Sequence, residues 1–278
     1  MTTTTTITPP DDSPVDHVPA TTPAPRWSGL KHALALAKRS LIKTMRTPEA
    51  LIDVTVQPII MLLMFVYIFG GAISGGDTQQ YLQFVLPGMM GMSIAMAGIA
   101  IGQNLNQDIE KGVFDRFRSL PIARSAPLVG IVLADFVRYL VLFAITLGFG
   151  MLLGFSVQTD PLSVLAALGI SMAFGLCFSW VSVFVGMKAR TSGAVQGIMF
   201  LLVLPLSFAS STFVAPSTMP GWLESFVNVN PITHLVDTVR GLMVGGPVAT
   251  PLLWTLLWMG ILLVVFVPLA LRAYKRRA

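Results

Sequence analysis

Six apolar runs, each long enough to cross a lipid bilayer, constrain this chain more than any other feature of its sequence. A helix needs about 20 residues to cross the hydrocarbon core, and backbone inside lipid must satisfy its own hydrogen bonds. The sequence therefore predicts an all-α polytopic membrane protein with six transmembrane helices. The runs are Leu51–Ala72, Phe84–Gln103, Leu128–Phe155, Leu162–Met187, Ala194–Phe213 and Pro251–Leu271.

The basic residues lie almost entirely on one side of these runs. If the N-terminus starts inside the cell, all of the 18 Lys and Arg residues except Arg138 and Arg240 fall in inside segments. By the positive-inside rule, we expect both termini in the cytoplasm. Arg138 lies near the inner boundary of the third run, where we expect it to reach the surface or to pair with Asp135.

Two further segments precede the first run. Residues 1–25 are rich in Thr and Pro and contain no Lys or Arg, so they do not match a signal peptide, and we expect a disordered cytoplasmic tail. In residues 26–47, apolar side chains recur along one helical face with basic side chains opposite, which predicts an amphipathic helix on the inner membrane surface. The six-span domain then occupies residues 48–278.

A long outer segment separates the fifth run from the sixth. Two short helices fit it, one at about Gly221–Val227 and one that starts at Asn230 and Pro231 and ends at Gly245. Helices of this length cannot cross a bilayer. We therefore expect re-entrant helices that dip into the outer leaflet and pack on the rest of the protein.

Several motifs of enzymes are absent from the sequence. No G-x-x-x-x-G-K-[ST] loop is present, so any ATP that drives this chain must be hydrolysed by another polypeptide. The three histidines are isolated from one another, and no H-E-x-x-H or G-x-S-x-G motif occurs. We expect no catalytic residue, no metal site and no cofactor in this chain. The net charge of +5 follows the membrane topology, and we expect no nucleic-acid partner.

The stretch 107–125 is unusually charged for a chain in which only 11% of residues are Asp, Glu, Lys or Arg. On a helical wheel, Ile109, Val113, Phe114, Phe117 and Leu120 share one side, and acidic and basic residues cluster on the other. About a dozen residues cannot span a bilayer, so the pattern predicts a cytoplasmic amphipathic helix between the second and third spans. Mixed charge favours a docking surface for another protein, and an interfacial helix that binds lipid headgroups is the alternative.

The run Glu110-Lys111-Gly112-Val113-Phe114-Asp115-Arg116-Phe117-Arg118-Ser119-Leu120-Pro121 resembles the coupling helix of type-2 ABC exporter permeases, and of the daunorubicin-resistance type in particular. Asn230, Pro231 and Arg240 resemble the second signature of that family. The similarity extends from about Trp27 to Arg277. Val113 and Phe114 stand where many members have Thr and Leu, so the hydrophobic character is kept.

This resemblance implies one half of a transporter in the bacterial plasma membrane. Two permease chains, identical or sister subunits, would work with two copies of a cytoplasmic ABC ATPase that binds ATP and Mg. The cargo would be a hydrophobic or amphipathic drug, antibiotic or lipid, moved by alternating access. The residues that the resemblance assigns to ATPase coupling are Glu110, Lys111, Gly112, Val113, Phe114, Asp115, Arg116, Phe117, Arg118 and Pro121.

The family builds its substrate path from the second and fifth spans. Flexible methionine and aromatic side chains adapt to cargo of varied shape, so residues of these types are the candidates for that path. Ordinary packing or contact with lipid is the alternative for each of them. The candidates are Met89, Met92, Met96, Phe200, Leu204 and Phe208.

Three other functions fit the sequence less well. An ion-coupled secondary multidrug transporter needs a titratable residue deep in the membrane, whereas Asp53 and Asp135 lie near the inner boundary of their spans. An ABC permease for a polysaccharide or glycolipid would be expected to carry rows of aromatic residues, and here they are scattered. A membrane enzyme or scaffold would show polar residues clustered near one interface.

Overall fold

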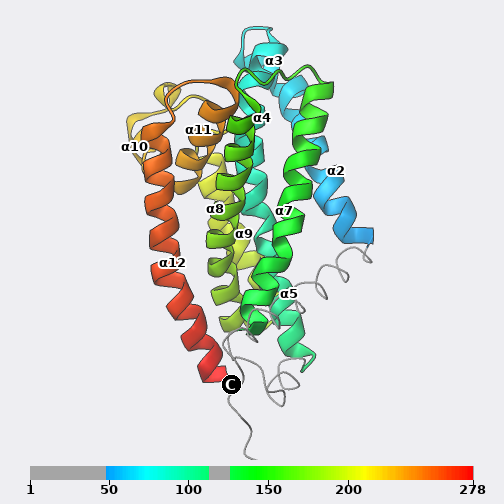
Figure 1. Cartoon of the computed structure of the whole chain (residues 1–278), viewed down its shortest axis with the longest axis vertical. Helices are drawn as coiled ribbons and strands as arrows, with labels where there is room; N and C mark the ends of the chain where they lie inside the picture. Colours follow the sequence, from blue (N-terminus) through cyan, green and yellow to red (C-terminus); the bar gives the residue numbers. More distant parts are fainter. Residues whose placement is uncertain (1–47, 113–125, 278) are drawn as a thin grey trace, which may run out of the picture.

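The structure is a computed structural model that describes residues 48–112 and 126–277. The predicted tail 1–25, the predicted amphipathic helix 26–47 and most of the charged stretch lie outside these residues. The described part of the chain is helical throughout and contains no strand. Its long helices run side by side along the longest axis of the molecule (Figure 1). We call the end where α5 and α12 finish the lower end, and the end with α3 and α11 the upper end.

The first membrane segment is built from three helical pieces in succession. Helix α2 passes without interruption into a π-helix, η1, and then into the short helix α3 at the upper end. A π-helix is a rare local widening of a helix that often occurs at functional sites. The bounds are α2 Pro48–Met64, η1 Phe65–Phe69 and α3 Gly70–Ile73.

Helix α5 continues α4 in the same direction, and α7, α8 and α9 then alternate in direction. Side chains of Asp77, Asp160 and Thr191 accept hydrogen bonds from backbone N–H groups in the first turns of α4, α8 and α9, which explains where these helices start. The bounds are α4 Thr78–Ala97, α5 Ile99–Glu110, α7 Ala126–Leu152, α8 Pro161–Lys188, α9 Ser192–Phe208, the 3-10 helix η2 Pro216–Thr218, α10 Gly221–Val227, α11 Pro231–Val244 and α12 Ala249–Arg277.

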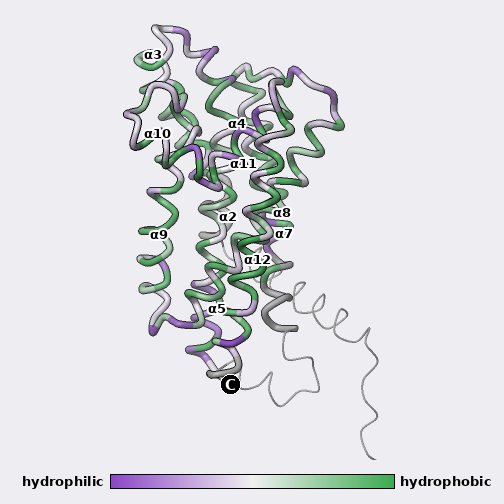
Figure 2. The backbone as a smooth tube through the Cα atoms, turned by 90° about the vertical axis from the view of Figure 1, so that its left-hand side faces the viewer, coloured by the Kyte–Doolittle hydropathy of each residue, from purple (hydrophilic) through white to green (hydrophobic). Residues whose placement is uncertain are grey.

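Among the described residues, five helical stretches are long and apolar enough to cross a membrane. They correspond to the first, second, third, fourth and sixth predicted runs. The fifth run, Ala194–Phe213, forms a helix only as far as Phe208, so α9 has 17 residues. Figure 2 shows hydrophobic residues along the helices and hydrophilic ones at the two ends of the bundle.

Two short helices occur where the sequence predicts them between the fifth and sixth runs. Helix α10 has the predicted bounds, and α11 begins at Pro231 with Asn230 as its N-cap. Gly245 ends α11 with a φ of 97°, a conformation that favours glycine. The entry of these helices into the outer leaflet stays a prediction.

Below Gln103, the end of the second predicted run, the chain stays helical. Helix α5 runs to Glu110, and Lys111 is its C-cap. Gly112 then takes a φ of 66°, in the left-handed region that terminates helices. Ile109 therefore belongs to the last turn of α5, and the rest of the predicted coupling helix, from residue 113 on, lies outside the described residues.

The core of the bundle is arranged around α8. This helix packs against α5, α7, α11 and α12, and its side chains from Phe174 to Val183 are mostly buried. By contrast, large apolar side chains of α2, α9 and α12 are exposed, among them Ile60, Leu201 and Val264. Exposed apolar surface of this kind fits contact with lipid or with another membrane chain.

Candidate functional site

A cavity of about 260 Å³ lies among α2, α4, α5, α7 and α9. Its wall on α4 comes from three methionines that recur at helical spacing, and its wall on α9 comes from residues four apart, so each set shares one helical face. All six residues that the sequence singles out for a substrate path line this one cavity. They are Met89, Met92, Met96, Phe200, Leu204 and Phe208. Their contact with a cargo stays a prediction.

Aromatic side chains close the upper end of the cavity. The ring of Phe65, in the π-helix, stacks on the ring of Phe213 with 4.1 Å between their centres. Phe208, at the end of α9, stacks on the same Phe213 ring at 5.2 Å. All three phenylalanines line the cavity. The upper end is therefore apolar and aromatic.

Polar side chains lie toward the lower end of the same cavity. On α2, α7 and α9, the polar lining residue lies below the Met, Leu or Phe lining residues, as the helix directions in Figure 1 show. Among the described residues that line the cavity, none is Asp or Glu. The polar residues toward the lower end are Gln57 on α2, Gln103 on α5, Arg138 on α7 and Gln196 on α9, whereas the small hydroxyl of Ser93 lies among the methionines of α4. The cavity thus has two chemically different ends.

The sequence analysis did not select these four polar residues. Polar side chains inside membrane segments usually face the interior of a bundle or a cavity, so the isolated glutamines within apolar runs were a usable signal. The sequence alone could not show that side chains from four different helices meet. Arg138, expected at the surface or beside Asp135, lines the cavity.

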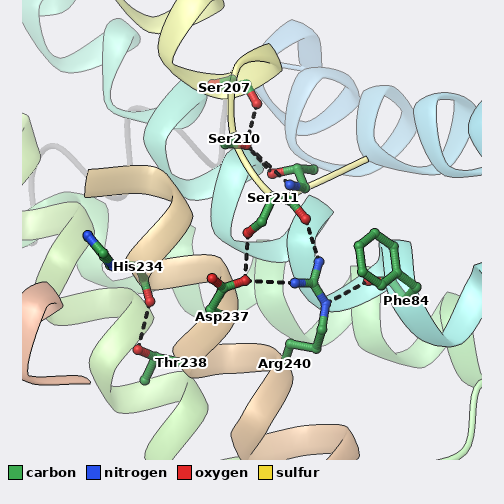
Figure 3. A network of polar contacts seen from close by, with 9 residues as sticks. Phe84, Ser207, Ser210, Ser211, His234, Asp237, Thr238 and Arg240 are labelled. Atoms are coloured by element: carbon green, nitrogen blue, oxygen red, sulfur yellow. Dashed lines mark hydrogen bonds and ion pairs between the residues drawn. The ribbon is translucent and has the colours of Figure 1, made fainter. Parts of the chain in front are cut away.

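A second polar site lies above the cavity and is centred on Arg240 of α11 (Figure 3). Its guanidinium donates to a carboxylate oxygen of Asp237 at 2.8 Å, to the Ser211 carbonyl at 2.7 Å and to the Phe84 carbonyl at 3.2 Å. It also lies 4.0 Å from the centre of the Phe84 ring. Burial lowers the pKa of Arg240 to about 10, against the opposing effect of Asp237, so the group stays charged at neutral pH.

Asn230 joins the ends of two helices at this site. Its Nδ2 donates to the carbonyls of Leu206 and Ala209, both at 2.6 Å, and its Oδ1 accepts from the N–H of Ile232 at 2.9 Å. The last carbonyls of a helix and the first N–H groups of the next lack helical partners. One amide thus satisfies groups at the end of α9 and at the start of α11, which explains why α9 can stop at Phe208.

The segment that follows α9 is held tightly between these groups. Ser211 donates to Asp237 at 2.6 Å, and Gly88 of α4 lies so close that a Cβ there would be 2.8 Å from the Thr212 carbonyl oxygen. Asn230, Pro231 and Arg240, the predicted family signature, do not line the cavity. Asn230 and Arg240 instead hold the segment that leads to Phe213.

Three of the ten predicted coupling residues are described. Glu110 and Lys111 are exposed and lie with Gly112 at the lower end of α5. The other seven lie outside the described residues, and their contact with an ATPase stays a prediction. They are Val113, Phe114, Asp115, Arg116, Phe117, Arg118 and Pro121. Within the described ranges, no three His, Cys, Asp or Glu side chains lie together as metal ligands.

The chain is similar to known membrane transport proteins. The family model for the ABC-2 type transporter matches residues 31–244. A daunorubicin resistance ABC transporter permease of Streptomyces coeruleorubidus is 39% identical over 239 residues, which are 86% of this chain and 84% of that protein. A probable doxorubicin resistance ABC transporter permease of Mycobacterium tuberculosis is 26% identical over 245 residues, 87% of this chain and 88% of that protein. A putative transport permease of Cyanophora paradoxa is 26% identical over 217 residues, 76% of this chain and 73% of that protein.

Proposed function

This chain belongs to the ABC-2 type transporter family, and we propose that it is the membrane permease of an ATP-driven exporter of amphipathic, drug-like molecules. The observation that carries this proposal is the two-ended cavity. Its methionine and phenylalanine walls offer adaptable apolar contacts, and its lower end offers hydrogen-bonding side chains. The names of the relatives, which refer to daunorubicin and doxorubicin resistance, support the same class of cargo.

The cavity suggests how a cargo molecule lies. Its polar group would point toward Gln57, Gln103 and Gln196, and its apolar body would lie between the methionines of α4 and the phenylalanines. Such a molecule would enter from the lower, cytoplasmic end or from the inner leaflet. The aromatic rings at the upper end would separate it from the outside until the transporter opens.

The working transporter would contain two six-span permease chains, identical or sister subunits, and two ATPase subunits that carry ATP and Mg. Helix α9 would serve as the short fifth span, and α10 and α11 as re-entrant outer helices. Phe200 and Phe208 line the cavity and are about half exposed in the single chain, which supports a path completed by a second chain. The lower end, with both termini, would face the bacterial cytoplasm.

The test uses the permease purified together with its ATPase and placed in inside-out vesicles. We expect ATP-dependent uptake of daunorubicin that persists when a protonophore removes the proton gradient. Uptake that needs the gradient and not ATP would identify an ion-coupled transporter and reject the proposal.

A matched pair of variants tests the cavity itself. Met96→Trp narrows the cavity and should slow daunorubicin uptake several-fold, because a larger rigid side chain takes up the space of the cargo. Met151→Trp is the control, since Met151 lies on α7, is exposed and does not line the cavity. Equal uptake by the two variants would show that cargo takes another route.

A further inference from the structure

We propose that Asn106 is a positioning residue that joins the lower end of α5 to the turn between α8 and α9, so that the coupling residues and the cavity wall move as one body. The inference rests on the proposed function in one respect, since it takes the ATPase to act at the end of α5. Asn106 lies outside both segments that resemble the signatures of the family.

The hydrogen bonds of Asn106 are directed at the end of another helix. Its Nδ2 donates to the carbonyl of Gly186 at 2.9 Å and to the carbonyl of Ala189 at 3.0 Å. Gly186 lies in the last turn of α8 and Ala189 is its C-cap, and the last carbonyls of a helix have no following helical N–H to accept from. The side chain is 1% exposed. Asn106 therefore caps α8 from inside the bundle.

Two glycines bring the same helices into direct backbone contact one turn above. A Cβ on Gly102 of α5 would collide with the carbonyl oxygen of Ser182, and a Cβ on Gly186 of α8 would lie 2.5 Å from the carbonyl oxygen of Gly102. Backbone atoms cannot move aside as a side chain can. The two helices are thus fixed to each other by close contact at Gly102 and by hydrogen bonds at Asn106.

The fixed turn leads directly into the cavity wall. Thr191 lies two residues after Ala189, and its side chain caps α9 by accepting from the N–H of Ala194 at 3.2 Å. The first turns of α9 then carry Gln196 and Phe200, which line the cavity. The start of α9 also touches α5 itself, because a Cβ on Gly102 would lie 2.9 Å from a methyl group of Val195.

In the other direction, α5 leads to the coupling residues. Glu110 lies about one turn beyond Asn106 on the same uninterrupted helix, and Lys111 follows it. A push on this end of α5 displaces Asn106, and Asn106 displaces the α8–α9 turn. The route from the proposed ATPase contact to the cavity is therefore short and consists of rigid elements.

A polar side chain at the buried position of Asn106 would be unusual if the residue only filled space. Its Oδ1 is buried and accepts no hydrogen bond from the described residues. A buried unpaired acceptor is destabilising, and an apolar side chain would avoid that cost. An amide at this position is explained by the two carbonyls that it holds in place.

The first experiment measures the geometry without an ATPase or a cargo. Spin labels are attached to cysteines that replace Lys111 and Arg190, both exposed, in full-length chain in which Cys177, the only cysteine, is changed to Ala. We expect a narrow distribution of label distances with Asn106 and a broadened one in Asn106→Ala. Asn104→Ala is the matched control, because Asn104 is an exposed asparagine on the same helix. An equally narrow distribution in Asn106→Ala would overturn the proposal.

The second experiment measures daunorubicin moved per ATP hydrolysed by the complex with its ATPase. Asn106→Ala and Asn106→Asp should lower this ratio by roughly tenfold, since coupling between sites is typically worth factors of this size, while ATP hydrolysis continues. Asn104→Ala should keep the ratio of the unaltered chain. A purely structural role would reduce the amount of folded complex and leave the ratio unchanged, which would overturn the inference.

The two proposals fail in distinguishable ways. An unaltered complex that moves no daunorubicin with ATP contradicts the proposed function, and the label distances still decide whether Asn106 fixes the turn. An unaltered complex that transports, together with unchanged Asn106 variants, contradicts the role of Asn106 alone.

Discussion

The two ends of α9 are held by similar means but with different chemistry. At each end an asparagine amide donates to two backbone carbonyls, Asn106 below and Asn230 above. At each end a glycine also permits close backbone contact, at Gly102 below and at Gly88 above. The upper end adds an ion pair between Arg240 and Asp237. The lower attachment uses no charged side chain among the contacts described above.

The difference follows from the backbone that each attachment must hold. Above α9 the chain is irregular, and an irregular segment offers several carbonyls that need donors; one guanidinium with five N–H groups supplies many at once. Below α9 the partner is a helix end, where the amide of Asn106 donates to two carbonyls. The upper attachment therefore uses contacts from several polar side chains, and the lower attachment combines the Asn106 amide with the close backbone contact at Gly102.

The largest effect should follow from removing the charge at the upper end. Arg240→Leu leaves Asp237 without its cation and removes the donors to the Ser211 and Phe84 carbonyls that Arg240 supplies. The ion pair is partly buried, and hydrogen bonds to a charged group contribute about 1.5–3 kcal/mol, so we expect a clearly lower melting temperature in detergent. Arg190→Leu, an exposed arginine at the lower end, is the control and should change little. Equal melting temperatures would contradict the central place of Arg240.

Substitution of glycine by alanine at the two close contacts tests which end of α9 is packed more rigidly. Gly102→Ala and Gly88→Ala should each destabilise the fold by about 1–3 kcal/mol through overpacking. We expect the larger loss for Gly102, because its new Cβ would meet the backbone of another helix at Ser182. The new Cβ on Gly88 would meet the irregular segment at Thr212. Thermal unfolding measures both. Gly169→Ala, with no atom within 4 Å of the new Cβ, should be neutral or slightly stabilising, and a loss there would refute the explanation.

Substitution of Asn230 and substitution of Asn106 should have similar effects on stability and different effects on transport. Asn230→Ala and Asn106→Ala each leave two carbonyls without their donor, and we expect a loss of about 1–2 kcal/mol in each. Only Asn106→Ala should lower the amount of daunorubicin moved per ATP. The same reduction in Asn230→Ala would show that the upper end also takes part in coupling, and the contrast between the two ends would then be lost.

The smallest effect concerns the two ends of α8. Its lower end is capped by the neutral amide of Asn106, whereas its upper end is capped by Asp160. A hydrogen bond from the Ser163 hydroxyl, with backbone hydrogen bonds, lowers the pKa of Asp160. A lowered pKa adds stability above the ordinary value of the carboxyl group, and that stability is lost as the pH falls through the folded value.

We therefore expect Asp160→Asn to melt slightly below the unaltered chain at neutral pH and together with it in strong acid, because asparagine keeps the cap without the charge. Melting curves between pH 7 and pH 3 measure the difference in melting temperature. These pH values lie on either side of the ordinary pKa of an aspartate side chain. A difference that does not change with pH would show that the charge adds nothing. The Asn106 end has no titratable group in its hydrogen bonds and supplies the contrast.

Residue type and the assignment of the second and fifth spans led to six candidates that line one cavity, and their contact with a cargo stays a prediction. The methionines of α4 and the phenylalanines of α9 recur at spacings that place each set on one face, so their common cavity could be anticipated once both helices were assigned. The start of α11 was equally clear, because Asn230 followed by Pro231 is a strong helix start. Local patterns of this kind are encoded by neighbouring residues.

Contacts between helices could not be predicted in the same way. Gln57, Gln103, Arg138 and Gln196 come from four helices, and no spacing in the sequence shows that they meet. The end of the helix at Glu110 was not anticipated, because a wheel drawn through residues 107–120 assumes continuous helical backbone and Gly112 has a positive φ. The inward direction of Asn106 could have been found, since it shares a buried stripe with Ile101, Gly102 and Leu105.

The π-helix at Phe65–Phe69 makes the effect of a deletion in the first membrane segment depend on its position. A π-helical turn holds one residue more than an α-helical turn, and each residue of an α-helix turns the chain by about 100°. Deletion of a single residue from this turn would keep nearly all of the apolar composition of the segment. It would convert the turn into an α-helical one and leave α3 in nearly the same direction, whereas the same deletion within α2 would rotate the Phe65 ring by about 100° around the helix axis.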